Sequence, residues 1–526
     1  MRDQDPGAAV AYFDDALHQR STDGVLLSFA LQAALGMGNV EKALELAPLT
    51  IKEAGGNSAA YLVLALDALR HKNYISAKAN LEKTGDNGFN VLLKPLLMSW
   101  IDLGNGDVKT AMADLDALDK FNGFEALKMY HLALLADASG QSDLANTQYV
   151  NAMNGFTARS ARLLQSYGAY LERQGRPEEA KALFETYIKE HPSSPIIQLL
   201  LKDIAAGRKI PPVIESPVDG AAEALYTAAS IIGREQATSI AATYIYFALM
   251  LEPDFPVARV MLAEAEEDRG QWQEALNLYS QIDPNSIYGK NAKIRSAWAI
   301  YKLGRNEEAV TILEAIAEKY PDDIKALVVL ADLKRDLKSW NDAAQQYARA
   351  IGRLKSDDTR HWSLFYARGI AYEQSKQWDL AEADLLKALE LNPEHPQILN
   401  YLAYSWVDRD ENLQKAKEML IKAVSLRPND GYIIDSLGWL YYRLGDFDNA
   451  VAQLEKAVSL EAADSTINDH LGDAFWRIGR RDEARYQWQR ALWLDPAVTQ
   501  IPLIREKLLD GLSDDVKAEA KSSGPG

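Results

Sequence analysis

The feature that most constrains this 526-residue chain is a pattern of small residues that returns about every 34 positions. The clearest copy reads S-L-G-W-L-Y-Y-R-L-G-D-F-D-N-A-V-A-Q-L-E-K-A, from Ser436 to Ala457. The next copy reads H-L-G-D-A-F-W-R-I-G-R-R-D-E-A-R-Y-Q-W-Q-R-A, from His470 to Ala491. A glycine inside each copy marks a turn, so each copy predicts two helices that cross where their small residues meet.

Each predicted helix pair has two small positions and one bulky position, counted from the first residue of its repeat. Small residues at positions 8 and 20 let two helices approach closely, and a bulky residue at position 24 fills the layer beside them. Proline at position 32 ends the second helix before the next pair begins. In this numbering the repeats begin at Gly24 (the weakest copy), Ser58, Leu92, Ala126, Ala161, Ala222, Pro256, Lys290, Ile324, Trp362, Pro396, Gly431 and Ser465.

A 34-residue period with this content resembles the tetratricopeptide repeat (TPR), which has two antiparallel helices per repeat. The resemblance implies an all-α fold, a right-handed superhelical α-solenoid. We expect about 13 helix-pair repeats, a half repeat at the N-terminus and a C-terminal capping helix. Such stacked repeats present extended surfaces to other molecules.

The largest break in the period predicts the domain organisation. The segment 195–221 includes I-P-P-V-I-E-S-P and reads either as a joint between two repeat blocks or as a lid across the concave face. We therefore expect blocks at 1–194 and 222–512, a capping helix at 499–512 and a disordered tail at 513–526. Ala9, Phe13 and Ala16 match a second helix whose first helix is missing, which predicts natural sequence upstream of Met1.

Composition and motifs argue against several classes of function. Acidic residues outnumber basic ones by 75 to 57, which disfavours nucleic-acid binding. The chain has no cysteine, and its seven histidines lack the spacing of metal ligands. It shows no nucleophile elbow, phosphate-binding loop or zinc-protease motif. We therefore expect no enzyme activity, no cofactor, no metal and no small-molecule substrate.

Aromatic and acidic residues share the face that should line the groove of the last repeats. In a TPR pair the first helix lines the concave face, at positions such as 2, 5, 9, 12 and 13. Exposed tryptophan and tyrosine there serve as anchors for a protein partner, although each tryptophan can equally pack between repeats. The predicted protein-binding residues are Asn400, Tyr404, Tyr432, Asp435, Trp439, Tyr442, Asp469, Asp473 and Trp476.

The charge of this groove narrows the class of partner. TPR proteins that hold a terminal carboxylate use lysine, asparagine and arginine on this face, whereas positions 5 and 9 here carry Asp435, Asp469 and Asp473. Such a groove repels a carboxylate and favours a basic or a neutral apolar segment. An arginine cluster between Arg477 and Arg490 reads as a solvated face or as a second contact patch.

Three stretches resemble one bacterial group of TPR proteins: L-N-Y-L-A-Y-S-W-V-D-R (Leu399–Arg409), D-S-L-G-W-L-Y-Y-R-L-G-D (Asp435–Asp446) and Asp469–Leu492. The group consists of cell-envelope proteins, often outer-membrane lipoproteins that face the periplasm. The resemblance implies an adaptor that binds a carboxyl-terminal processing protease and presents its substrates, including cell-wall hydrolases. Membrane association is expected only through a lipid anchor that this sequence does not contain.

Two other functions remain open from the sequence. One is a cytoplasmic peptide-binding or assembly module, similar to co-chaperones. The other is a regulatory TPR array that belongs to a separate enzyme, because no catalytic domain is recognisable in this chain.

Overall fold

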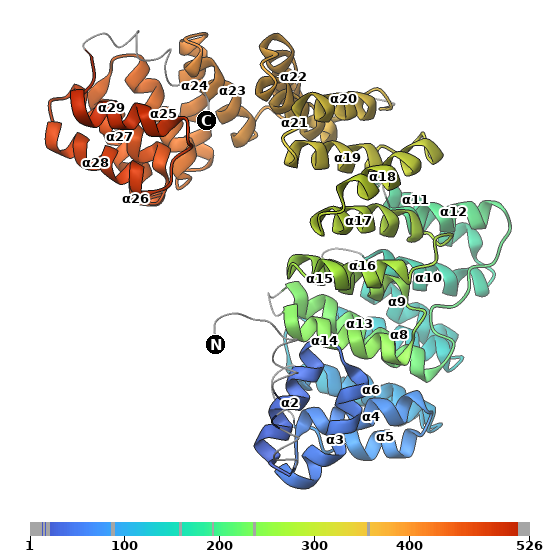
Figure 1. Ribbon diagram of the computed structural model, residues 1–526. Coiled ribbons are helices and arrows are strands. Elements are labelled where there is room, and N and C mark those ends of the chain that lie inside the picture. The colour runs from blue at the N-terminus through green and yellow to red at the C-terminus, as the bar shows by residue number, and fades with distance from the viewer. Residues whose placement is uncertain are drawn as a thin grey trace. The chain divides into compact units, whose positions relative to one another are not determined.

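The computed structural model describes residues 13, 16, 22–85, 90–156, 160–191, 194–234, 238–354 and 358–513. Within these ranges the chain forms α-helices, two short 3-10 segments and no strand (Figure 1). It divides into two compact units, unit 1 (Met1–Ala309) and unit 2 (Val310–Gly526). Over the same ranges, no helix combines the length and the apolar character that crossing a bilayer requires.

Unit 1 begins with successive antiparallel helix pairs, each joined by a short turn. The last of them is followed by a single helix, α12 (Pro195–Ala205). The pairs are α2 (Gly24–Gly36) with α3 (Val40–Ala54), α4 (Ser58–Arg70) with α5 (Tyr74–Leu81), α6 (Asn90–Gly104) with α7 (Val108–Asp114) and η1 (Leu115–Lys120), α8 (Glu125–Ala138) with α9 (Ser142–Gly155), and α10 (Ala161–Arg173) with α11 (Pro177–Glu190).

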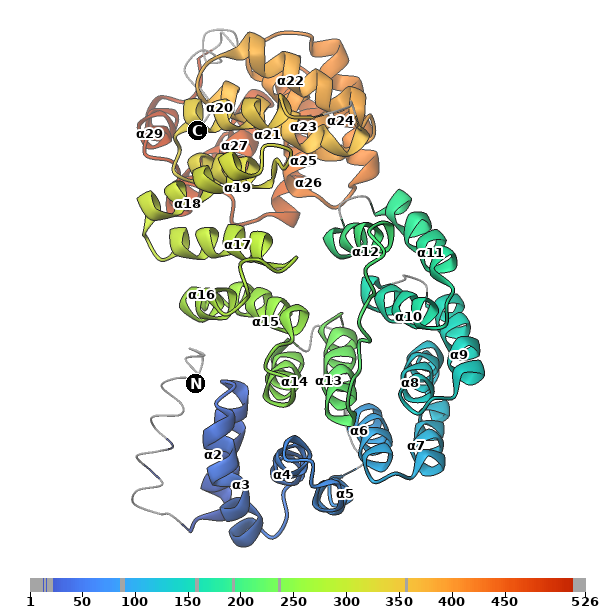
Figure 2. The same cartoon turned by 90° about the vertical axis from the view of Figure 1, so that its right-hand side faces the viewer.

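After α12 the chain returns along the helices it has already made. Helix α13 (Pro217–Arg234) packs against α6 and α8, and α14 (Thr238–Leu251) packs against α2, α3 and α4 (Figure 2). Gly220 permits the approach, because a Cβ atom there would lie 2.2 Å from the Trp100 ring. Unit 1 continues with α15 (Pro256–Asp268), α16 (Trp272–Ser280) and α17 (Gly289–Lys302), and α18 (Asn306–Lys319) contains the division between the units.

Unit 2 repeats the helix pair in sequence and ends in a single helix, α29 (Gln500–Asp510), which packs on α28. Its pairs are α19 (Lys325–Asp336) with α20 (Trp340–Ile351), α21 (Trp362–Gln374, preceded by η2, Thr359–His361) with α22 (Trp378–Leu391), α23 (Pro396–Asp408) with α24 (Leu413–Leu426), α25 (Gly431–Arg443) with α26 (Phe447–Leu460), and α27 (Ser465–Arg477) with α28 (Arg481–Trp493).

Contacts between small and bulky residues hold each pair together. A Cβ atom added to Gly438 would lie 2.6 Å from Cγ of Leu454, and one added to Gly472 would lie 2.5 Å from the Trp488 ring. These are the small residue at position 8 and the bulky residue at position 24 of the same repeat. The sequence pattern thus reflects direct packing between the two helices of a pair, and glycine permits the close approach.

The predicted fold class is confirmed. The described residues contain thirteen helix pairs, and each begins at or near a predicted repeat start. The largest difference is α13, which begins at Pro217 rather than Ala222, because its first turn also packs in unit 1. The capping helix predicted at 499–512 is α29.

The predicted domain boundaries at 194, 221 and 512 stay predictions. The segment 195–221 contains α12 and the first turn of α13, and both lie within unit 1. Of the predicted half repeat, Phe13 and Ala16 are helical and Phe13 stacks on Phe29, with ring centroids 6.3 Å apart. The rest of the half repeat and residues 514–526 of the predicted tail lie outside the described residues.

Candidate protein-interaction site

The nine predicted binding residues lie on the first helices of the last three pairs of unit 2, α23, α25 and α27. These first helices pack against one another in succession, α23 on α25 and α25 on α27. They therefore share one side of unit 2, which we call the inner surface. The arrangement follows from the repeat, since the first helix of each pair packs beside the first helix of the next pair.

The packing of neighbouring helices also buries most of the predicted residues. Asp435, Trp439, Tyr442, Asp469, Asp473 and Trp476 are buried, whereas Asn400 and Tyr404 are half-buried. Tyr432 is the exposed member of the set, with 55% of its surface accessible. Both tryptophans thus occupy packing positions, which is the alternative that the sequence left open, and their role in binding stays a prediction.

Trp439 stands at the centre of a stack of rings that joins two repeats. Its indole lies 4.8 Å from the Tyr442 ring and 4.1 Å from the His470 ring, and both pairs are nearly parallel. Tyr442 lies on the same helix, α25, whereas His470 comes from α27. The stack therefore fixes the spacing between two neighbouring first helices.

A buried ion pair accompanies this stack. Nδ1 of His470 lies 2.9 Å from Oδ1 of Asp435, and both side chains are buried. Burial by itself lowers the pKa of His470, but the charges of Asp435, Asp469 and Asp473 outweigh it and raise the pKa above its usual value. The carboxylates around the imidazole therefore favour its charged form.

The C-terminal helix α29 covers the remaining carboxylates. Nζ of Lys507 donates to Oδ2 of Asp469 and to Oδ2 of Asp473, each at 2.8 Å. Nε1 of Trp488 donates to the other oxygen of Asp473, also at 2.8 Å. Burial raises the pKa of Asp473 to about 6, although the Lys507 charge acts in the opposite direction. The end of the inner surface is thus closed by a lysine of the same chain.

Trp476 is covered in a similar way. Its Nε1 donates to the backbone oxygen of Leu512 at 3.3 Å, and the guanidinium groups of Arg481 and Arg485 lie 3.8 and 5.2 Å from its ring centroid. Part of the arginine cluster noted in the sequence therefore packs on an aromatic ring.

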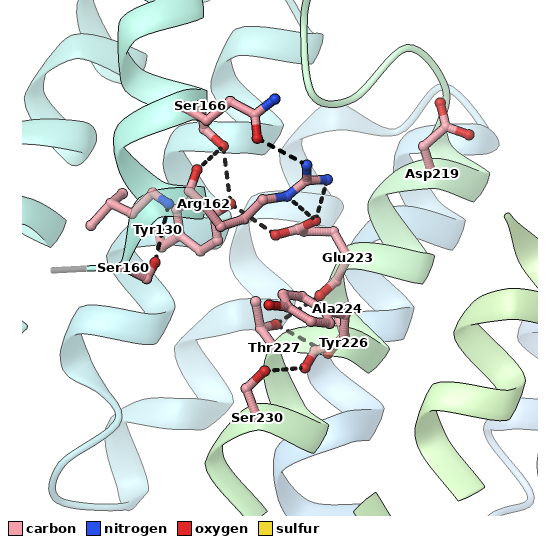
Figure 3. A network of polar contacts seen from close by, with 12 residues as sticks. Tyr130, Ser160, Arg162, Ser166, Asp219, Glu223, Ala224, Tyr226, Thr227 and Ser230 are labelled. Carbon is pink, nitrogen blue, oxygen red and sulfur yellow. Dashed lines mark hydrogen bonds and ion pairs between the residues drawn. The ribbon is translucent and has the colours of Figure 1, made fainter. Parts of the chain in front are cut away.

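The corresponding side of unit 1 carries a polar network that links α13 to α8 and α10 (Figure 3). Nε and Nη2 of Arg162 donate to Oε2 of Glu223 at 3.0 and 2.8 Å, and the Tyr130 hydroxyl donates to Oε1 at 2.9 Å. Glu223 is fully buried. Nearby, Nε2 of His131 lies 2.9 Å from the Thr227 hydroxyl, and burial lowers the pKa of His131 to about 4.

Sequence reasoning missed several residues of these clusters. In the sequence Asp408 stood out only as part of the stretch Leu399–Arg409, His470 as one of seven histidines, and Lys507 as a residue of the predicted capping helix. A signal did exist for His470, because it follows Asp435 by 35 positions, about one repeat, which places the two on adjacent first helices. Among the described residues, no group of three or more histidines and carboxylates is arranged to hold a metal ion.

Family models of the tetratricopeptide repeat match this chain in both units. The matched residues are 161–204, 256–281, 294–359, 362–395 and 436–497. This chain contains tetratricopeptide repeats.

Relatives of this TPR protein match it over short stretches. A TPR repeat-containing protein of Pseudomonas aeruginosa is 29% identical over 189 residues, which are 36% of this chain and 31% of that protein. The NatB auxiliary subunit N-alpha-acetyltransferase 25 of Rattus norvegicus is 29% identical over 173 residues, which are 30% of this chain and 17% of the subunit. The chain thus aligns with a third or less of the length of either relative.

One solved structure aligns with nearly the whole length of this chain. The crystal structure of the APC/C hetero-tetramer Cut9–Hcn1 aligns with 97% of this chain and 94% of that chain. The TM-score is 0.41 and the sequence identity is 14%.

Proposed function

We propose that this TPR protein is a non-enzymatic scaffold that binds protein partners on the inner surface of unit 2. The strongest support is that the first helices of the two units differ in what covers them. In unit 1, α13 and α14 pack against the first helices α2, α4, α6 and α8. In unit 2, α25 exposes Tyr432, and the charges of Asp464, Glu461 and Asp430 act on it. An exposed aromatic near carboxylates is a suitable anchor for a partner.

We further propose a specific scaffold role, an adaptor that binds a carboxyl-terminal processing protease and delivers cell-envelope substrates such as cell-wall hydrolases. The support is the resemblance of Leu399–Arg409, Asp435–Asp446 and Asp469–Leu492 to envelope TPR proteins. In this role the protein is periplasmic and associated with the outer membrane. Holding protease and substrate on one scaffold raises the effective concentration of one for the other.

A second candidate is a regulatory subunit of a different enzyme. The similarity to a NatB auxiliary subunit favours it, because the name of that relative describes a subunit that accompanies an acetyltransferase. The two candidates differ in the enzyme that should accompany the chain, a protease or a transferase.

Affinity capture of the full chain from envelope extracts, followed by mass spectrometry, tests the proposal. The adaptor role predicts recovery of a carboxyl-terminal processing protease and of at least one cell-wall hydrolase. Tyr432→Ala should reduce that recovery, whereas Tyr486→Ala is the matched control. Tyr486 is 59% exposed but lies on α28, a second helix. Recovery of a transferase with no protease favours the second candidate, and recovery that is equal for both variants contradicts binding at the inner surface.

A further inference from the structure

A cavity of about 220 Å³ lies between the inner surface of unit 2 and α29. Tyr404, Asp408 and Trp439 line it on one side, and Ile504 and Lys507 of α29 line it on the other. Its volume exceeds that of several waters, at about 30 Å³ each. It is smaller than the roughly 300 Å³ at which drug-sized ligand pockets begin. The space therefore suits one side chain of a partner better than a whole drug-sized ligand.

The charges around this cavity are incompletely balanced. Lys507 pairs with Asp469 and Asp473, and His470 pairs with Asp435. Within the described residues, these pairs leave the Asp408 carboxylate without a cation at ion-pair distance. The charges of His470 and Arg443 act on Asp408 from beyond that distance: His470 pairs with Asp435, and the Arg443 guanidinium pairs with Oδ1 of Asp410 at 3.8 Å. The field inside the cavity therefore favours a positive charge.

A second observation also points to a missing ligand. Trp439 is 5% exposed, and its indole N–H has no partner at hydrogen-bond distance. Burial raises the pKa of the Asp408 carboxylate, and the N–H lies near enough to lower it but makes no full hydrogen bond to the carboxylate; both side chains line the same cavity. An occupant that donates to Asp408 and accepts from this N–H supplies the hydrogen bonds that the two side chains do not complete with each other.

The chain itself shows how this cluster accepts an ammonium group. Nζ of Lys507 sits between Asp469 and Asp473 and donates to both. Burial lowers the pKa of Lys507, but the two carboxylates outweigh burial and raise it. A lysine with 17% of its side chain exposed thus stays charged at one side of the cavity, because carboxylates surround it.

We propose that this cavity is a socket for a cationic side chain, a lysine or an arginine, of a protein partner. The ammonium or guanidinium group donates to Asp408, its aliphatic stem lies along Tyr404 and Ile504, and the adjacent backbone carbonyl of the partner accepts from Trp439. The inference rests on the proposed scaffold function and adds the chemistry of the segment that is bound.

The test uses the full chain and a pair of fluorescein-labelled peptides, acetyl-Gly-Ala-Lys-Ala-Gly-amide and the same peptide with norleucine in place of lysine. Fluorescence anisotropy measures affinity, and the ¹⁵N–¹H resonance of the Trp439 indole reports the place of binding. The lysine peptide should bind at least about tenfold more tightly than the norleucine peptide and should shift the Trp439 resonance saturably. Equal affinity for the two peptides, or no binding of either, overturns the proposal.

Two matched variants locate the contact. Asp408→Asn should weaken lysine-peptide binding about tenfold, whereas Glu418→Gln removes the same charge from the exposed side of α24 and should leave affinity unchanged. Equal effects of the two substitutions contradict the socket. If Asp408→Asn lowers the melting temperature, Trp439→Phe serves instead. That variant keeps a ring but loses the N–H donor, so it should weaken lysine-peptide binding, and unchanged affinity contradicts the socket.

Two further measurements separate related explanations. Putrescine carries the same ammonium group without a peptide, and binding as tight as that of the lysine peptide would identify a free diamine as the ligand. In the affinity capture described above, partners that bind wild type and Asp408→Asn equally disprove the socket but leave the scaffold function intact. Failure of wild type to recover any partner disproves the scaffold function itself.

Discussion

The two units cover the first helices of the same repeat in different ways. In unit 1 the chain returns and α13 lies against the first helices, where Arg162 and Tyr130 satisfy the buried carboxylate of Glu223. In unit 2 the first helices are covered at their end by the single helix α29, and a cavity remains beside Asp408. The comparison teaches that a first helix of this repeat serves either as an internal packing surface or as a binding surface, depending on what later sequence covers it.

The buried histidines show the same contrast in their charge. His131 of unit 1 faces Thr227 and Glu223, and burial lowers its pKa to about 4. His470 of unit 2 faces Asp435, Asp469 and Asp473, and their charges raise its pKa despite burial. The folded protein therefore favours the neutral form of His131 and the charged form of His470. Unit 1 fills its interior with neutralised groups, whereas unit 2 keeps an excess of negative charge.

The largest effect is expected from Arg162→Met in unit 1. The substitution leaves the Glu223 carboxylate buried with only a hydroxyl partner, and breaking a buried pair in this way costs about 3–5 kcal/mol. Hydrogen–deuterium exchange should show lost protection in α10 and α13, with unit 2 unchanged. Arg305→Met is the control. Arg305 and Glu308 form a surface ion pair with about half of each side chain exposed, and such a pair is worth about 1 kcal/mol or less. Equal losses from the two substitutions would show that α13 is not held by this network.

Opposite pH dependences are the next largest expectation. The folded pKa of His131 is lowered, so its stabilising effect is complete above about 6.5 and is lost as the pH falls toward 4, by about 3 kcal/mol. The folded pKa of His470 is raised, so its effect is present below about 6.5 and is lost as the pH rises through the folded value. Exchange protection of α8 and α27, measured from pH 5 to pH 8, checks both signs.

Matched variants isolate each histidine from other titrating groups. His131→Asn should remove the acid-side loss in α8, and His470→Asn should remove the base-side loss in α27. A pH dependence that is the same in both units, or that survives both substitutions, contradicts the assignment of a neutral and a charged histidine.

A smaller effect is expected at the contact between small and bulky residues in unit 2. Gly438→Leu forces a side chain into the space of Leu454, and overpacking of this kind costs about 1–3 kcal/mol. Because repeats couple mainly to their neighbours, protection should fall in α23–α28 and persist in unit 1. Gly36→Ala is the control, since a Cβ atom there meets nothing within 4 Å. Uniform loss across both units would contradict nearest-neighbour coupling.

The smallest effect concerns the turn inside each repeat. Gly445 has a φ angle of 75°, and the equivalent Lys376 adopts 64° although lysine disfavours that region. Lys376→Gly should stabilise unit 2 by up to about 1 kcal/mol, measured by urea unfolding. Gly445→Ala should destabilise it by a similar amount, and a change of the same sign from both substitutions would refute the strain.

The helix pairs could be predicted because their determinants are local. Gly438 and Leu454 meet within one repeat, and the same contact returns in each following repeat. The return of α13 could not be predicted in this way, because Arg162 and Glu223 are 61 residues apart and outside any shared period. The segment 195–221, which the sequence indicates is either a joint or a lid, contains α12 and the first turn of α13, and the pair α13–α14 packs along earlier first helices.

The helices that form the candidate site could be predicted from the sequence, but the solvent exposure of their groove residues could not. Positions 5, 9 and 12 of each first helix were identified as groove residues, yet Asp435 and Trp439 are buried by the next first helix, and Asp469 and Asp473 are covered by α29. Only the three-dimensional packing shows which groove positions remain open. Tyr432, at position 2, is exposed because it lies at the start of α25.

Site-specific photo-crosslinking in cells that produce the protein tests the central claim most directly. A photoreactive phenylalanine analogue is placed at position 432 on the inner surface of unit 2 or at position 486 on α28. The account predicts that a protein partner is crosslinked from position 432 and not from position 486. Crosslinking from position 486 alone, or no partner at position 432, would contradict the claim that the inner surface of unit 2 is where this protein binds others.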